Sequence, residues 1–92
     1  MTIKLTYPVK SHQIEDLIPL YEEFKLVNPD IFGKWQELGK DFYNDDPAPY
    51  VPISKAVKEF LRERVEWESE AALIGAYADF GRLLYKETYL ND

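Results

Sequence analysis

His12 is the single histidine of this 92-residue chain, which contains no cysteine. It lies between Ser11 and the acidic pair Glu15 and Asp16, close to the start of a predicted helix. A Ser–His–acid triad needs side chains that converge, and neighbours on one helical turn rarely do so. The lack of thiols and of a second histidine excludes thiolate zinc sites, iron–sulfur clusters and paired Glu–His di-iron sites. We therefore predict no catalytic residue, no metal site and no cofactor, and we do not expect an enzyme.

Acidic side chains outnumber basic ones by 17 to 11, which gives a formal net charge of −6. Paired carboxylates can perform acid–base chemistry where burial separates their pKa values. Here most of them alternate with lysines and arginines, so we predict a solvated surface. The Asn44–Asp46 run lacks the ligand spacing and the glycine of a calcium-binding loop. The acidic balance argues against a nucleic-acid partner and favours a protein partner with a basic surface.

A proline-rich segment at residues 44–52 combines charge, stiffness and aromatic side chains. Its three prolines within six residues favour an extended connector between two helices rather than a helix. A stiff segment loses little conformational entropy when it docks, and tyrosines are typical of interfaces. We predict that a protein partner binds at this segment, through Asp41, Tyr43, Asp45, Asp46 and Tyr50.

The elements that must position these residues are mostly helical. The hydrophobic pattern predicts a mainly α-helical single domain, residues 1–92, of three to four helices with a short N-terminal β-strand or extended arm. Ile3, Leu5 and Tyr7 alternate with polar residues, as in a strand. No second convincing strand follows. The N-terminal strand therefore either pairs across a homodimer or remains an extended arm.

Apolar residues follow helical spacing over residues 11–27, and these are Ile14, Leu17, Ile18, Tyr21 and Phe24. Pro19 interrupts this pattern, because proline inside a helix removes a hydrogen bond and clashes with the preceding turn. Either Asp16 caps a helix that begins just before Pro19, or a longer helix begins near Ser11 and kinks at Pro19. A second helix is predicted from Asn28 onward, with Trp35 on its apolar face.

The pattern from Ser54 almost to the end of the chain is helical, as one long helix or as two helices with Ser69 capping the second. Trp67 is expected to anchor the core together with Trp35. A stripe of small residues on this segment lets another helix approach closely, and its members are Ala71, Gly75 and Ala78. We expect the stripe either to pack against the first helices or to form the seam of a homodimer.

A strand followed by the segment Glu15–Phe24 resembles the opening of the GNAT family of acetyltransferases. The resemblance covers about a quarter of the chain. That family binds the coenzyme A pyrophosphate through a (Gln/Arg)-x-x-Gly-x-(Gly/Ala) loop after a central strand. Gln36–Asp41 matches this loop in part, but it ends in aspartate and lies within a helical pattern. The resemblance implies a small-ligand module as one function class.

No signal-peptide pattern is visible, and no apolar run approaches the ~20 residues that span a bilayer. We therefore expect no membrane partner and a cytoplasmic location. The first function hypothesis is a small acidic protein that binds another protein, as an inhibitor, immunity protein, adaptor or regulator. The alternative is a structural homo-oligomer built on the C-terminal helix. The third is an acetyltransferase-like or other small-ligand module.

Overall fold

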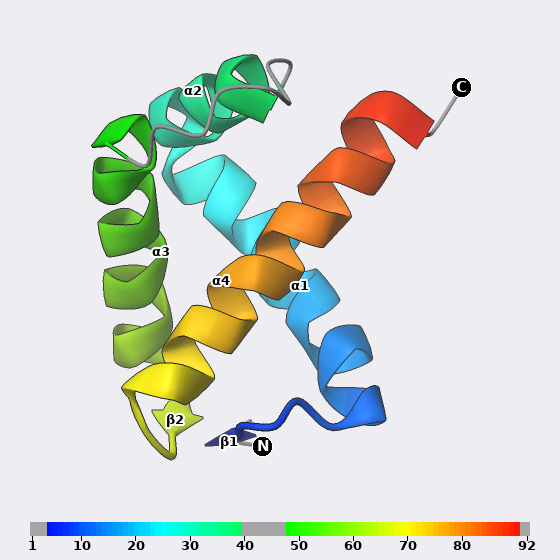
Figure 1. Cartoon of the computed structure of the whole chain (residues 1–92), viewed down its shortest axis with the longest axis vertical. Helices are drawn as coiled ribbons and strands as arrows, with labels where there is room; N and C mark the ends of the chain where they lie inside the picture. The colour runs from blue at the N-terminus through cyan, green and yellow to red at the C-terminus, as the bar shows by residue number, and fades with distance from the viewer. Residues whose placement is uncertain (1–3, 40–47, 91–92) are drawn as a thin grey trace.

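A computed structural model describes residues 4–39 and 48–90 of the chain. Its elements follow one another as two short strands and four helices with two short helical segments (Figure 1). They are β1 (Lys4–Leu5), α1 (Ser11–Val27), α2 (Pro29–Gly39), the 3₁₀ turn η1 (Ala48–Tyr50), α3 (Val51–Arg64), β2 (Glu66–Trp67), α4 (Glu70–Tyr85) and the π-helix η2 (Lys86–Leu90). The predicted mainly α-helical fold with an N-terminal strand is confirmed.

Helices α1 and α4 cross in the middle of the molecule, with α4 in front of α1 in the view of Figure 1. Helices α2 and α3 lie on one side of this crossing. Aromatic side chains from all four helices meet in the core, where most ring pairs adopt the edge-to-face arrangement that ring quadrupoles favour. The rings are those of Tyr21, Phe24, Phe32, Trp35, Phe60, Tyr77 and Phe80.

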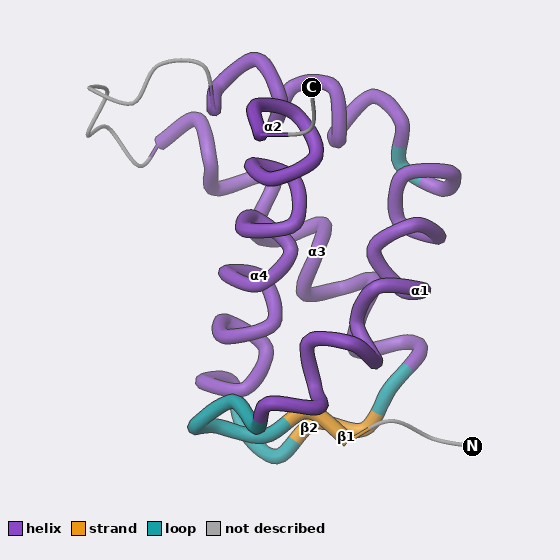
Figure 2. The backbone as a smooth tube through the Cα atoms, turned by 90° about the vertical axis from the view of Figure 1, so that its right-hand side faces the viewer, coloured by secondary structure: helices purple, strands orange, loops and turns teal. Residues whose placement is uncertain are grey.

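Strand β1 has its partner within the chain. It pairs in parallel with β2, with Lys4 opposite Glu66 and Leu5 opposite Trp67, below the helices in Figure 2. Leu5 is 0% exposed, so the strand places an apolar side chain in the core. The expectation that no second strand follows is wrong, and so is that of an unpaired arm. Its partner was missed because β2 has only two residues and carries no period-2 pattern.

Helix α1 begins at Ser11 and contains Pro19, so the alternative start at Asp16 is wrong. Pro19 cannot donate to the carbonyl of Glu15. Both residues lie on the exposed side of α1, where water can hydrate that carbonyl.

The buried face of α1 contains Leu17, Tyr21 and Phe24 of the predicted stripe. It includes the polar residue Gln13, whose Oε1 accepts a hydrogen bond from the Thr6 amide at 2.9 Å. Ile14 and Ile18, which we expected in the core, are exposed instead. Trp67, which we expected to anchor the core, is also exposed. The central carbon of the Arg62 guanidinium lies over its ring, 5.6 Å from the ring centroid.

The C-terminal part of the chain forms two helices, α3 and α4, rather than one. Ser69 caps α4, as one alternative predicted, because its Oγ accepts a hydrogen bond from the Ala72 amide. Helix α3 begins at Val51, so the end of the predicted extended connector 44–52 is helical. Pro52 is tolerated there because amides in the first helical turn have no intrahelical partner.

The fold that the acetyltransferase resemblance implies is not found in the part of the chain that the structure describes. The described part of this chain has two strands of two residues each, whereas that family has a sheet of several strands. Gln36 lies inside α2 and does not follow a strand.

Candidate functional site

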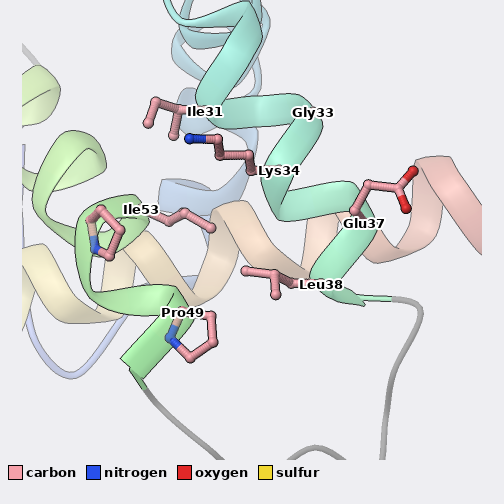
Figure 3. A pocket seen from close by; sticks show the side chains of 8 residues that line it. Ile31, Gly33, Lys34, Glu37, Leu38, Pro49 and Ile53 are labelled. Atoms are coloured by element: carbon pink, nitrogen blue, oxygen red, sulfur yellow. The ribbon is translucent and has the colours of Figure 1, made fainter.

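A surface groove of about 550 Å³ lies between α2 and the start of α3 (Figure 3). Leu38 of α2 and Ile53 of α3 point toward each other across it, and Ile31 and Pro49 extend the apolar wall. The groove is lined from one side by α2 and from the other by η1 and the first turn of α3. Its lining residues are Ile31, Gly33, Lys34, Glu37, Leu38, Pro49, Pro52 and Ile53.

The chemistry of the groove is mainly apolar. Lys34 and Glu37 are exposed charged side chains at its edge, and the remaining lining side chains are aliphatic or proline. A small-molecule site usually adds a few polar groups that converge on the ligand. This lining instead offers burial to an apolar side chain. Within residues 4–39 and 48–90, no group of three histidine, cysteine, aspartate or glutamate side chains is placed to hold a metal ion.

Of the residues predicted to bind a partner, Tyr50 lies beside this groove. The hydroxyl of Tyr50 donates to the carbonyl oxygen of Leu38 at 3.2 Å, which ties η1 to the end of α2 beside the groove. The Tyr50 side chain is half-buried and packs against the core. The other four predicted residues lie outside the described part of the chain, and these are Asp41, Tyr43, Asp45 and Asp46.

The predicted seam on α4 faces partly outward. Ala71 and Ala78 are exposed, and Ile74 between them is 54% exposed. Gly75 is half-buried, because a Cβ atom at this position would lie 3.3 Å from Val9 Cγ2. The N-terminal segment therefore covers one edge of the stripe, and the outer face of α4 is formed by Ala71, Ile74 and Ala78.

A polar cluster that the sequence did not reveal joins η2 to α1. The Glu87 carboxylate accepts hydrogen bonds from the Tyr21 hydroxyl at 2.5 Å and from the Lys25 ammonium at 2.7 Å. The Lys25 bond, with that of Tyr21, lowers the pKa of Glu87. Burial and this carboxylate raise the pKa of Tyr21, so Tyr21 is not an activated base. The cluster therefore ties η2 to α1 through two hydrogen bonds to one carboxylate.

A second hollow, of about 510 Å³, lies along the N-terminal segment. Its lining mixes the ammonium groups of Lys4 and Lys10 with the carboxylate of Glu68, and all three are exposed. The structure describes the backbone of His12 in the first turn of α1, but not its side chain.

Among the described residues, no helix has the length and apolar character needed to cross a membrane. Comparison with protein-family models, with curated proteins and with solved structures finds no match for this chain. The function must therefore be argued from the geometry and charge of the molecule itself.

Proposed function

We propose that this chain is a non-catalytic protein-binding module whose groove between α2 and α3 receives an apolar side chain of a partner protein. The observation that carries the proposal is an open, mostly apolar groove on the surface of a small acidic protein. Binding hot spots are apolar or aromatic side chains that fill such pockets and are ringed by polar contacts. Lys34 and Glu37 are placed to supply polar contacts at the edge.

The partner has a basic surface around the inserted side chain. A net charge of −6 attracts positively charged proteins over several ångströms and raises their association rate. The same charge repels the nucleic-acid backbone. An inhibitor, an immunity protein, an adaptor or a regulator would act in this way.

Photo-crosslinking from the edge of the groove tests the proposal. A benzoyl-phenylalanine at Lys34 should crosslink one protein in cells, whereas the same group at Lys55, an exposed position of α3 outside the groove, should not. The crosslinked protein is then purified, and its affinity for variants of the chain is measured by calorimetry.

Two neighbouring residues in the first turn of α3 supply a matched pair of variants. Pro52 lines the groove and Val51 does not, yet both are exposed. Pro52→Gln should weaken binding about tenfold, or about 1.4 kcal/mol, because it places an amide on the apolar wall. Val51→Gln should leave the affinity unchanged. Equal affinities of the two variants would show that the partner binds elsewhere.

A second candidate is a homodimer through the outer face of α4. Ala71, Ile74 and Ala78 lie on one side of the helix at spacings of three and four, and the exposed Ile74 lies between two small residues. Sedimentation equilibrium should then give twice the chain mass of 10.8 kDa. Ala78→Glu should restore the monomer, and Pro52→Gln should not. A wild-type monomer at micromolar concentration would rule this candidate out.

A further inference from the structure

One carboxyl group lies inside the molecule without a full set of hydrogen-bond partners. The Asp79 side chain, in the middle of α4, is 2% exposed. Its Oδ1 atom accepts a bond from Arg82 Nη1 at 3.2 Å, whereas its Oδ2 atom has no partner among the described residues. A buried carboxylate needs several hydrogen bonds to offset its lost hydration. The position therefore suits the neutral acid better than the ion.

The surroundings of Asp79 offer little compensation. Ala72, Ala76 and Phe80 lie beside it on the buried side of α4. Arg82 is 78% exposed, so solvent screens its charge. On the elements packed against α4, no other described charged side chain is buried. The charged side chains there that form ion pairs do so with residues other than Asp79. These pairs are Lys25 with Glu22 and Glu87, Arg62 with Glu70, and Arg64 with Glu23 and Glu63.

We propose that Asp79 makes the packing of α4 sensitive to pH: the neutral acid fits the buried face, and its ionisation loosens α4 from α1 and α3. This device is independent of the groove and of the binding function proposed for it. It also gives a physical role to the one buried carboxyl oxygen that lacks a partner in the described structure.

The direction of the pH effect follows from proton linkage. Burial raises the pKa of Asp79 above its usual range, and the charge of Arg82 opposes this shift only in part. Between the unfolded pKa and the raised folded pKa, the folded protein holds more protons than the unfolded chain. Stability therefore falls as pH rises through this window and is constant above it. This group alone changes the unfolding constant by up to about tenfold per pH unit in that window.

Urea unfolding between about pH 3 and pH 8 tests the proposal on the full chain, since this range brackets the ordinary aspartate pKa near 3.9. Asp79→Asn cannot ionise, so its midpoint minus that of the wild type should increase as pH rises above about 4 and then level off. Asp16→Asn, at an exposed position of α1, is the matched control, for which the same midpoint difference is measured. A difference between Asp79→Asn and wild type that does not change with pH would overturn the proposal.

Carbon-13 NMR of the wild-type side-chain carboxyl groups gives a second measurement that needs no stable variant. The Asp79 resonance, assigned by its absence from Asp79→Asn or by through-bond correlation, should titrate above the ordinary aspartate midpoint near 3.9. A midpoint at or below that ordinary aspartate value would show that the buried position does not favour the neutral acid, and the proposal would fail.

Discussion

At the residue scale, Glu87 of η2 binds two residues of α1 that lie 62 and 66 positions away in sequence. Its carboxylate binds both the Tyr21 hydroxyl and the Lys25 ammonium of α1. The same ammonium lies over the rings of Tyr21 and Phe32, at 5.0 and 5.7 Å from their centroids. Hydrogen bonds to charged groups stabilise more than neutral ones do. One carboxylate therefore fixes η2 against α1.

Removing the charge of Glu87 should weaken the fold in a pH-dependent way. The lowered pKa of Glu87 means that the unfolded chain binds more protons than the folded protein just below pH 4.5, the ordinary value for this group. The stabilisation is thus complete above that pH and is lost as pH falls through the lowered pKa. The urea midpoint of Glu87→Gln should lie below that of the wild type at pH 7 and approach it on acidification.

The control for Glu87→Gln is Glu15→Gln, at an exposed position of α1. Its midpoint should remain close to that of the wild type at pH 7, as for most exposed substitutions. A deficit of Glu87→Gln that is the same at pH 3 and pH 7 would mean that the carboxylate charge contributes nothing. Ionisation of Glu87 stabilises the fold, whereas we propose that ionisation of Asp79 destabilises it. The contribution of each group is therefore taken as the difference in urea midpoint between its own variant and the wild type.

At the scale of elements, the strand pair joins the N-terminal segment to the rest of the core. β1 places Leu5 fully inside the protein, and the Glu68 amide donates to the Leu5 carbonyl at 3.0 Å. Leu5→Ala should lower the free energy of unfolding by about 3 kcal/mol, because most of a buried leucine side chain is removed and a cavity remains in its place. Small domains are stable by only about 5–15 kcal/mol, so urea denaturation will detect this loss easily.

Lys4→Ala is the matched control for Leu5→Ala, since Lys4 is the exposed neighbour on the same strand. Its unfolding free energy should stay within about 0.5 kcal/mol of the wild type. A Leu5→Ala variant as stable as Lys4→Ala would mean that the N-terminal segment does not belong to the core.

Sequence periodicity predicted the helices better than it predicted their orientation. In α3 and just after it, the apolar residues at helical spacing are buried as the pattern predicts, and these are Val57, Phe60, Leu61 and Val65. In α1 the pattern favoured Ile14 and Ile18, but the Thr6 amide recruits Gln13 to the buried side. A hydrogen bond between two elements is invisible to a hydrophobic pattern. The same reason hid β2, which owes its strand geometry to β1.

The candidate groove was outside the reach of sequence reasoning for a different reason. Its wall comes from α2, η1 and α3, and no single stretch of the chain carries a motif for it. Tyr50 was selected for its aromatic ring, whereas the structure uses its hydroxyl to hold the end of α2. Pro52, predicted to lie in an extended connector, lies instead in the first turn of α3.

At the scale of the whole molecule, charge and apolar surface favour different partners. Each chain carries a net charge of −6, so two copies repel each other, whereas a basic protein is attracted. Apolar contact through the outer face of α4 is not weakened by salt. The two proposed associations therefore respond to ionic strength in opposite directions.

Ionic strength can thus separate the groove proposal from the homodimer proposal. Raising salt from about 0.1 M to about 1 M shortens the screening length from about 10 Å to about 3 Å. The association rate with the crosslinked groove partner, measured by stopped flow, should fall about tenfold over this range because steering by the acidic surface is lost. Self-association through α4, measured by sedimentation, should strengthen instead, since screening removes the repulsion between like charges. An association rate that stays constant or rises with salt would show that the acidity of this protein plays no part in finding its partner.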